Sequence, residues 1–152
     1  MTERTAVHGT FTIERTYGAS RECVFRAWAD VKAKARWFKP PAGFEQTPLT
    51  SDFRVGGREN TCSTPPGGKP HVFDTTYWDI VPNERIVYCY EMHIGEAKIS
   101  VSLATVEFKP AGSGTRLVVT EQGVFLDGYD DAGSRERGTR GLLDQLEAAL
   151  SA

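Results

Sequence analysis

VFDTTYWDIVPNERIVYCYEMHI, residues 72–94, contains two runs rich in aromatic and β-branched residues, separated by Pro82, Asn83 and Glu84. Such runs are typical of β-strands, and proline and asparagine between them are typical of a turn. A connection this short joins antiparallel neighbours, because a parallel crossover needs about a dozen residues or more. Residues 72–94 therefore predict an antiparallel hairpin.

The same pattern of short runs and turn residues extends over about residues 44–122. The runs end at proline, glycine or polar clusters, which again favours antiparallel neighbours. An alternating segment at residues 9–17, GTFTIERTY, predicts one more strand near the start of the chain. The further runs are RENTCS before TPPGGKP, KISVSLATVEFK before PAGSG, and TRLVVTEQ, whose strand we expect to end at Gly123.

Two short helices are expected between the first strand and this region. Ser20 is a suitable N-cap for a helix whose Val24, Ala27 and Trp28 share one face. Asp30 is a suitable N-cap for a second helix, which should end near residue 38 because two prolines follow. The charged positions of VKAKAR, residues 31–36, are interpreted as the solvent-facing side of this second helix.

The chain ends with an apolar stripe at helical spacing, after a polar stretch at residues 126–138 that reads as a loop. A helix carrying this stripe needs an apolar surface to cover, and the sheet is the largest one expected. The fold class is therefore α+β, with about six or seven antiparallel strands and a helix against the sheet. The stripe consists of Leu142, Leu143, Leu146, Ala149 and Leu150.

Composition sets limits on the function. The length of 152 residues fits one domain over residues 1–152, with a folded core at about 9–150. The net charge is −2, and the sequence has no basic block that could bind nucleic acid. No stretch approaches the ~18 apolar residues of a membrane span, so we expect a soluble, cytoplasmic protein. The three cysteines and three histidines show no metal-ligand spacing, and we expect neither a metal nor a cofactor.

Gly56 and Gly57, in DFRVGGREN at residues 52–60, raise the question of a phosphate-binding loop. Such loops follow G-x-G-x-x-G or G-x-x-x-x-G-K-[ST] and lead into a helix. This pair fits neither pattern and leads into a strand-like run. We therefore interpret it as a bulge or tight bend, where a residue without Cβ is needed.

Four segments in this order, FRAWADVKAKARWFKP, DFRVGGRE, YWDIVPNERIVY and GSGTRLVVTEQG, resemble the activator of heat-shock-protein-90 ATPase homologue family of the START-like superfamily. The resemblance covers about residues 11–150. It implies the helix-grip fold, in which a curved antiparallel sheet wraps around a long C-terminal helix. One position departs from the family: Thr139 follows Gly138 where relatives usually have tryptophan.

A sheet that grips a helix leaves space for a cavity, and side-chain alternation predicts its wall. The predicted wall is mainly aromatic and aliphatic, with two glutamates set into it. The candidate ligand-binding residues are Trp37, Phe38, Glu59, Thr61, Phe73, Tyr77, Tyr88, Tyr90, Val106, Phe108, Glu121, Leu142 and Leu143.

The two glutamates suggest chemistry, because an ionised carboxylate is costly in an apolar cavity unless it is paired. Glu59 and Glu121 are the candidate bases, and Tyr77 or Tyr90 the candidate acid, of an acid–base reaction. A structural role for both glutamates, with Tyr77, Tyr90 or Arg58 as partners, stays open at this stage. Glu121 is expected toward one end of the cavity, just before the turn at Gly123.

The sequence favours binding of a small apolar or aromatic molecule over catalysis. Two alternatives stay open: a polyketide cyclase, dehydratase or hydrolase-like enzyme that uses the same cavity, and a co-chaperone, which only the family name implies. Neither nucleic acid nor a membrane is an expected partner, and a homodimer is left open.

Overall fold

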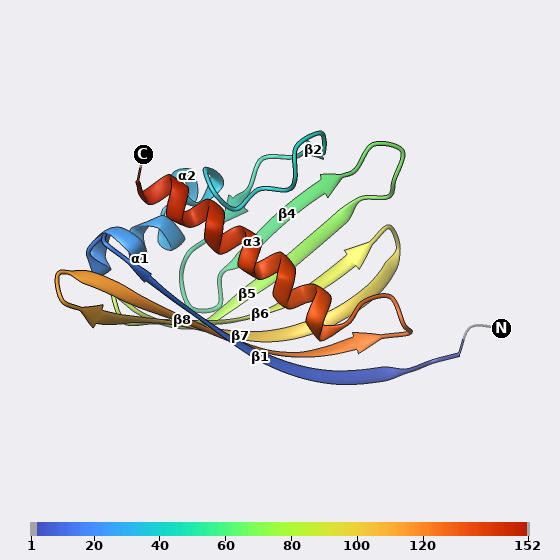
Figure 1. The fold of residues 1–152 in the computed structure, drawn as a ribbon. Helices are drawn as coiled ribbons and strands as arrows, with labels where there is room; N and C mark the ends of the chain where they lie inside the picture. Colours follow the sequence, from blue (N-terminus) through green and yellow to red (C-terminus); the bar gives the residue numbers. More distant parts are fainter. Residues whose placement is uncertain (1–2, 152) are drawn as a thin grey trace.

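The computed structural model describes residues 3–151 as a curved antiparallel sheet with one long helix across its concave face (Figure 1). The elements in chain order are β1 (Ala6–Tyr17), α1 (Arg21–Ala29), α2 (Val31–Ala35), β2 (Glu45–Gln46), β3 (Thr50–Ser51), β4 (Arg58–Thr64), β5 (His71–Val81), β6 (Arg85–Ile94), β7 (Ala97–Ala111), β8 (Gly114–Leu126) and α3 (Ala132–Leu150).

The sheet has eight strands in the order β1-β8-β7-β6-β5-β4-β2, and β3 also pairs with β4. Every pairing is antiparallel, which confirms the α+β helix-grip prediction. The expected hairpin at residues 72–94 is β5 and β6, in which Tyr77 pairs with Tyr88. The strand number exceeds the six or seven expected because β2 and β3 are only two residues long and carry no periodic pattern.

Gly123 does not end a strand, contrary to the expectation from sequence. β8 continues through it to Leu126, and Gly123 pairs with Gly9 on one side and Ser102 on the other. A Cβ on Gly9 would lie 2.5 Å from the Cβ of Ala132. Gly9 therefore leaves the room that the start of α3 needs, whereas a Cβ on Gly123 would lie 3.1 Å from Ser102 Oγ within the sheet.

Gly56 and Gly57 form a tight bend before β4, which confirms that interpretation. Gly56 has a φ of +82°, and the Gly57 N–H donates to the Arg54 carbonyl at 2.8 Å. A Cβ on Gly57 would lie 1.9 Å from the Asp52 carbonyl oxygen, so the bend excludes larger residues there.

The predicted caps of the two short helices are confirmed. Ser20 accepts a hydrogen bond from the Cys23 N–H at 3.2 Å, and Asp30 accepts from the Lys32 N–H at 2.8 Å. α2 itself ends at Ala35, and one further turn carries the chain to Phe38.

α3 begins earlier than the sequence suggested. Residues 132–138 were expected in a loop, but they are helical, with Asp131 as the N-cap accepting from the Ser134 N–H at 2.8 Å. Gly133 and Gly138 lower the helix propensity of this segment. The cap and the contacts of α3 with the sheet outweigh that cost.

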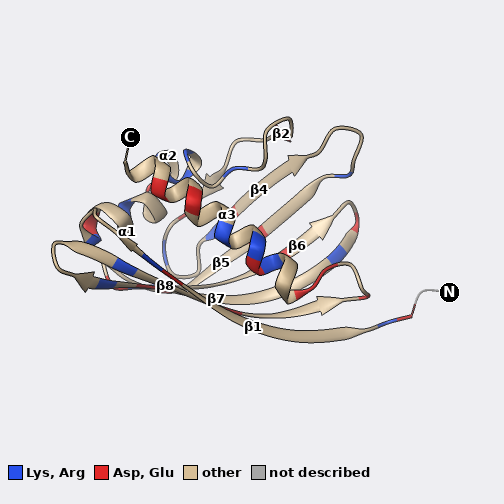
Figure 2. Cartoon of the chain, in the orientation of Figure 1, with Lys and Arg blue, Asp and Glu red and all other residues tan. Residues whose placement is uncertain are grey.

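The charges along α3 also point to contacts with the sheet. Figure 2 shows mostly basic residues in its first half and acidic residues in its second half, the reverse of what the helix dipole favours. Arg135 instead bonds to Ser100 of β7, and Asp144 pairs with Arg15 of β1. Tertiary contacts, rather than the helix dipole, explain the placement of Arg135 and Asp144.

The core lies where α1, α2 and the second half of α3 meet the sheet. Its aromatic rings pack edge to face, with Trp28 and Trp37 4.8 Å apart and Phe25 and Phe108 5.3 Å apart between ring centroids. The largest fully buried side chains include Trp37, Tyr77, Phe108, Ile13, Ile86, Leu117, Leu143 and Leu146. Within residues 3–151, no helix has the length and apolar character needed to cross a membrane.

Candidate functional site

A cavity of about 670 Å³ lies between the sheet and α3. This volume is within the range of small-molecule sites in proteins. Ten of the residues predicted from sequence line it: Trp37, Phe38, Glu59, Thr61, Phe73, Tyr88, Tyr90, Glu121, Leu142 and Leu143.

The other three predicted residues are buried in the core and are absent from the cavity wall. Tyr77, Val106 and Phe108 are each at most 2% exposed. Side-chain alternation correctly predicted that all three point toward the concave face. However, α1, α2 and the second half of α3 cover that part of the sheet. Alternation identifies the face of a strand and does not separate the packed part of that face from the open part.

Aromatic rings form much of the cavity floor. Phe73 lies 5.8 Å from Tyr90 and 6.2 Å from Phe38, and Tyr88 lies 6.2 Å from Tyr90, all between ring centroids. Phe73, Tyr88 and Tyr90 come from the hairpin of β5 and β6. The hairpin thus supplies a broad apolar surface facing α3.

Lys34 and Glu59 form a buried ion pair in one wall. Lys34 Nζ lies 2.7 Å from Glu59 Oε2, and the Tyr77 hydroxyl donates to Glu59 Oε1 at 2.6 Å. Burial and the adjacent Glu59 carboxylate raise the pKa of Tyr77 well above its usual range, so this phenol stays protonated and donates. The expectation that the charged positions of α2 face solvent is wrong for Lys34, because β4 supplies a carboxylate that was not visible from local spacing.

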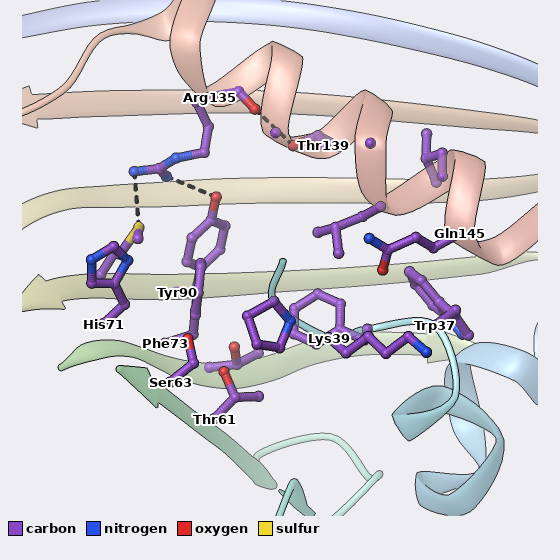
Figure 3. A pocket seen from close by; sticks show the side chains of 18 of the residues that line it. Trp37, Lys39, Thr61, Ser63, His71, Phe73, Tyr90, Arg135, Thr139 and Gln145 are labelled. Carbon is purple, nitrogen blue, oxygen red and sulfur yellow. Dashed lines mark hydrogen bonds between the residues drawn. The ribbon is translucent and has the colours of Figure 1, made fainter. Parts of the chain in front are cut away.

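A second polar group crosses from α3 to the sheet. Arg135, only 8% exposed, donates from Nη1 to the Tyr90 hydroxyl at 2.8 Å and from Nη2 to Ser100 Oγ at 2.8 Å and Asp130 Oδ2 at 2.9 Å. Figure 3 shows Arg135 reaching from α3 toward Tyr90. Arg135 thereby fixes the first half of α3 above the cavity.

Glu121 of β8 lies beside this group and is 3% exposed. Its two carboxylate oxygens lie 3.1 and 3.0 Å from the Tyr90 hydroxyl oxygen. Burial raises the pKa of Glu121 to about 7, against the opposing effects of the Arg135 charge and the Tyr90 hydrogen bond. The cavity therefore contains a carboxyl group that changes charge near neutral pH.

Small residues of α3 face the cavity. Gly138, Thr139 and Gly141 line it, and a Cβ on either glycine would meet no heavy atom within 4 Å. Thr139 lies on this surface and donates its hydroxyl to the Arg135 carbonyl at 3.1 Å. The small side chains leave space open beside this part of α3.

The segment after α2 forms an edge of the cavity. Lys39, Pro41 and Gln46 line it and are exposed. With its nitrogen turned toward this segment, the Gln145 amide donates to the carbonyl of Trp37 at 2.6 Å and to that of Lys39 at 3.2 Å. These two hydrogen bonds join α3 to the edge of the cavity. Figure 3 labels Gln145, Trp37 and Lys39 among the residues of the wall.

Sequence reasoning missed Lys34 and Arg135 as polar residues of the wall. A stripe of Arg135, Thr139, Leu142, Leu143 and Leu146 at helical spacing would have placed Arg135 on the inner face, had the helix start been recognised. For Lys34 no local signal exists, because its partner lies 25 positions away.

Two further observations concern an unpartnered hydrogen-bond donor in the wall and the possibility of a metal site. Trp28 lines the cavity, and its buried Nε1–H has no hydrogen-bond partner among residues 3–151. Across the described chain, no cluster of three or more His, Cys, Asp or Glu side chains could hold a metal ion. Hydrogen bonding, proton transfer and apolar contact are the chemistry that the wall offers.

Residues 18–151 match the model of a family described as Activator of Hsp90 ATPase homolog 1-like protein. A solved structure of a protein from Rhizobium leguminosarum is 47% identical, with a TM-score of 0.93 and 99% of each chain covered. The Mll3558 protein from Rhizobium loti is 48% identical, with a TM-score of 0.88, 95% of this chain and 99% of its own chain covered.

More distant structures share the fold. An AHSA1-like protein from Aeromonas hydrophila is 21% identical, with a TM-score of 0.71, and covers 94% of this chain and 92% of its own. A search of curated proteins gives no match. These findings agree with the family resemblance drawn from the sequence motifs.

Proposed function

The chain belongs to the family of activator of Hsp90 ATPase homolog 1-like proteins, and from this premise we propose that it binds a small, largely apolar molecule between its sheet and α3. The cavity of about 670 Å³ with its aromatic floor is the observation that carries this proposal. Covering an apolar ligand with an aromatic surface of this kind is favourable, because apolar area of both is removed from water.

The composition of α3 supports the proposal. Glycine inside a helix costs about 1 kcal/mol relative to alanine. Gly138 and Gly141 have room for a methyl group, so packing does not require glycine at either position. Small residues on this face keep the space beneath α3 available.

The candidate ligand contacts are the ten sequence-predicted residues of the wall, together with Lys34, Arg135 and Thr139. The apolar body of a ligand would lie on Phe73 and Tyr88, with Leu142 and Leu143 of α3 on its other side. The polar side chains of the wall would orient the ligand, while apolar contact supplies most of the affinity.

Calorimetric titration with neutral two-ring aromatic compounds, beginning with 2-methoxynaphthalene, tests this proposal. We expect saturable binding at one site and a melting temperature that rises with ligand concentration, because a ligand that binds only the folded state stabilises it. The absence of both saturable heat and any thermal shift across the series would reject a small apolar ligand.

Proton transfer is a second candidate function, favoured by the position of Glu121. A carboxyl group with a pKa of about 7 in a cavity wall is suited to take up and return a proton near neutral pH. If Glu121 is a base, Glu121→Gln removes turnover of a substrate while its affinity changes little. If the protein only binds, the same variant changes affinity and no turnover exists to lose.

A further inference from the structure

The two buried glutamates of the cavity differ in how fully their hydrogen-bonding capacity is used. Glu59 receives a separate donor on each oxygen: Lys34 on Oε2 at 2.7 Å and Tyr77 on Oε1 at 2.6 Å. These are short, charge-assisted contacts from two different elements. Glu59 is therefore engaged within the protein on both oxygens and has less capacity left for a ligand than Glu121 has.

Glu121 is under-satisfied by comparison. Its hydrogen-bond donor among residues 3–151 is the single hydroxyl of Tyr90, which lies 3.1 and 3.0 Å from the two oxygens. One O–H shared between two oxygens makes one full hydrogen bond, whereas a carboxylate accepts about four. Because Glu121 lines the cavity and is only 3% exposed, a ligand group inside the cavity is the partner that could use its remaining capacity.

Arg135 determines the direction of the hydrogen bonds at this site. It donates to the Tyr90 oxygen at 2.8 Å, so the Tyr90 hydrogen is directed to Glu121. Burial and the Glu121 charge also keep the pKa of Tyr90 above its usual range, so Tyr90 retains that hydrogen. Glu121 is consequently the last acceptor in the series of hydrogen bonds from Arg135 to Tyr90 to Glu121. While its carboxylate is ionised, it can accept hydrogen bonds but cannot donate one.

The charges nearby favour a neutral donor over a cation. Arg135 from α3 is the cation facing Glu121, and its guanidinium also contacts Asp130 at 2.9 Å. The other titratable groups facing Glu121 are the phenols of Tyr88 and Tyr90 from β6. An ammonium group would be repelled by Arg135, and it would lose more hydration free energy than an uncharged hydroxyl group does.

We propose that Glu121 is the acceptor site for a neutral hydroxyl group carried by an aromatic ligand whose ring system lies on Phe73 and Tyr88. This inference rests on the proposed function, since it assigns the polar contact of the same cavity. It defines the ligand class as aromatic alcohols or phenols, as opposed to hydrocarbons, ethers or amines.

Three probes with one ring system test the proposal: 2-naphthol, 2-methoxynaphthalene and 2-(aminomethyl)naphthalene. Affinities are measured by calorimetry at about pH 8, where Glu121 is mostly ionised and a phenol keeps its proton. We expect 2-naphthol to bind at least about tenfold more tightly than the ether, the effect of one charge-assisted hydrogen bond. The amine should bind more weakly than 2-naphthol.

Two variants assign the preference to Glu121. Glu121→Leu should retain binding of 2-methoxynaphthalene and lose the preference for 2-naphthol. Glu121→Gln, which keeps an acceptor oxygen without the charge, should reduce the preference and serves if the leucine variant does not fold. Glu14→Leu is the matched control, because Glu14 is exposed on the neighbouring strand β1 and pairs with Arg116; it should leave the preference unchanged.

Equal affinities of 2-naphthol and 2-methoxynaphthalene for the unmodified protein would overturn the proposal, and so would a preference that survives Glu121→Leu. Tighter binding of the amine would make the site a cation site and would also overturn it. If none of the three probes binds, the proposed function itself fails. Binding of the ether without a hydroxyl preference rejects this inference alone.

Discussion

Lys34 Nζ and Glu59 Oε2 lie 2.7 Å apart, and only 5% and 3% of the two side-chain surfaces are exposed. The pair joins α2 to β4, and the Lys34 ammonium also lies 4.7 Å from the centroid of the Phe38 ring. A buried charge is tolerated only while its partner is present. The pair therefore fixes α2 at the side of the cavity.

Glu59→Gln should destabilise the protein by about 3–5 kcal/mol, because it leaves the Lys34 ammonium buried without a counter-charge. The free energy of unfolding in urea measures this change. The double variant Lys34→Met with Glu59→Leu should recover most of the loss, since apolar residues of similar volume replace a buried pair with little net cost. A loss below about 1 kcal/mol in the single variant would mean that the pair is solvated and exposed.

Glu121 should make the stability of the protein depend on pH. Its pKa is raised by burial from 4.5 to about 7, so the folded state holds the proton more strongly than the unfolded state does. The resulting contribution is fully present below about pH 4.5 and is lost as the pH rises to about 7, by roughly 3 kcal/mol.

Glu121→Gln isolates this effect, because the amide does not titrate. The difference in unfolding free energy between the unmodified protein and the variant should change over that pH window and stay constant above it. A difference that is the same at every pH would show that the Glu121 carboxyl has an ordinary pKa.

Gly138→Ala should stabilise the protein by about 1 kcal/mol, because the added methyl group meets no heavy atom within 4 Å and alanine favours the helix. Gly57→Ala is the opposite case, since its Cβ would lie 1.9 Å from the Asp52 carbonyl oxygen, and it should lower stability. Urea unfolding of both variants checks the prediction. Destabilisation by Gly138→Ala would mean that α3 packs more closely there than the structure has it.

Thr139→Trp should fill the space beneath α3 and reduce the affinity for 2-methoxynaphthalene by about tenfold or more, because the indole occupies the volume that the ligand needs. Its melting temperature should stay the same or rise. Thr139→Ser is the matched control and should retain binding. Unchanged affinity in the tryptophan variant would place the ligand elsewhere.

The inner face of the sheet could be predicted because strand alternation depends on neighbouring residues alone. Phe73, Tyr88 and Tyr90 were assigned to one wall on this basis, and they line it. The division between core and cavity could not be predicted, since it depends on where the helices cover the sheet. Tyr77 and Phe108 lie in the covered part.

The polar contacts were harder to predict, because each joins elements far apart in the sequence. Arg135 and Tyr90 are separated by 45 positions, and Arg135 lies in a glycine-containing segment that read as a loop. Glu121 was selected for its position on the inner face, although the reason given for its place near a strand end was wrong. The homodimer and chaperone alternatives stay predictions, because one chain does not test them.

The central claim is that an apolar ligand occupies the space between the sheet and α3. Intermolecular nuclear Overhauser effects between 2-methoxynaphthalene and assigned side chains test it most directly. The account predicts contacts with Phe73 and Tyr88 of the sheet and with Leu142 of α3, all of which line the cavity. Contacts confined to the exposed residues Trp78, Val101 and Leu103 on the other face of the sheet would contradict it.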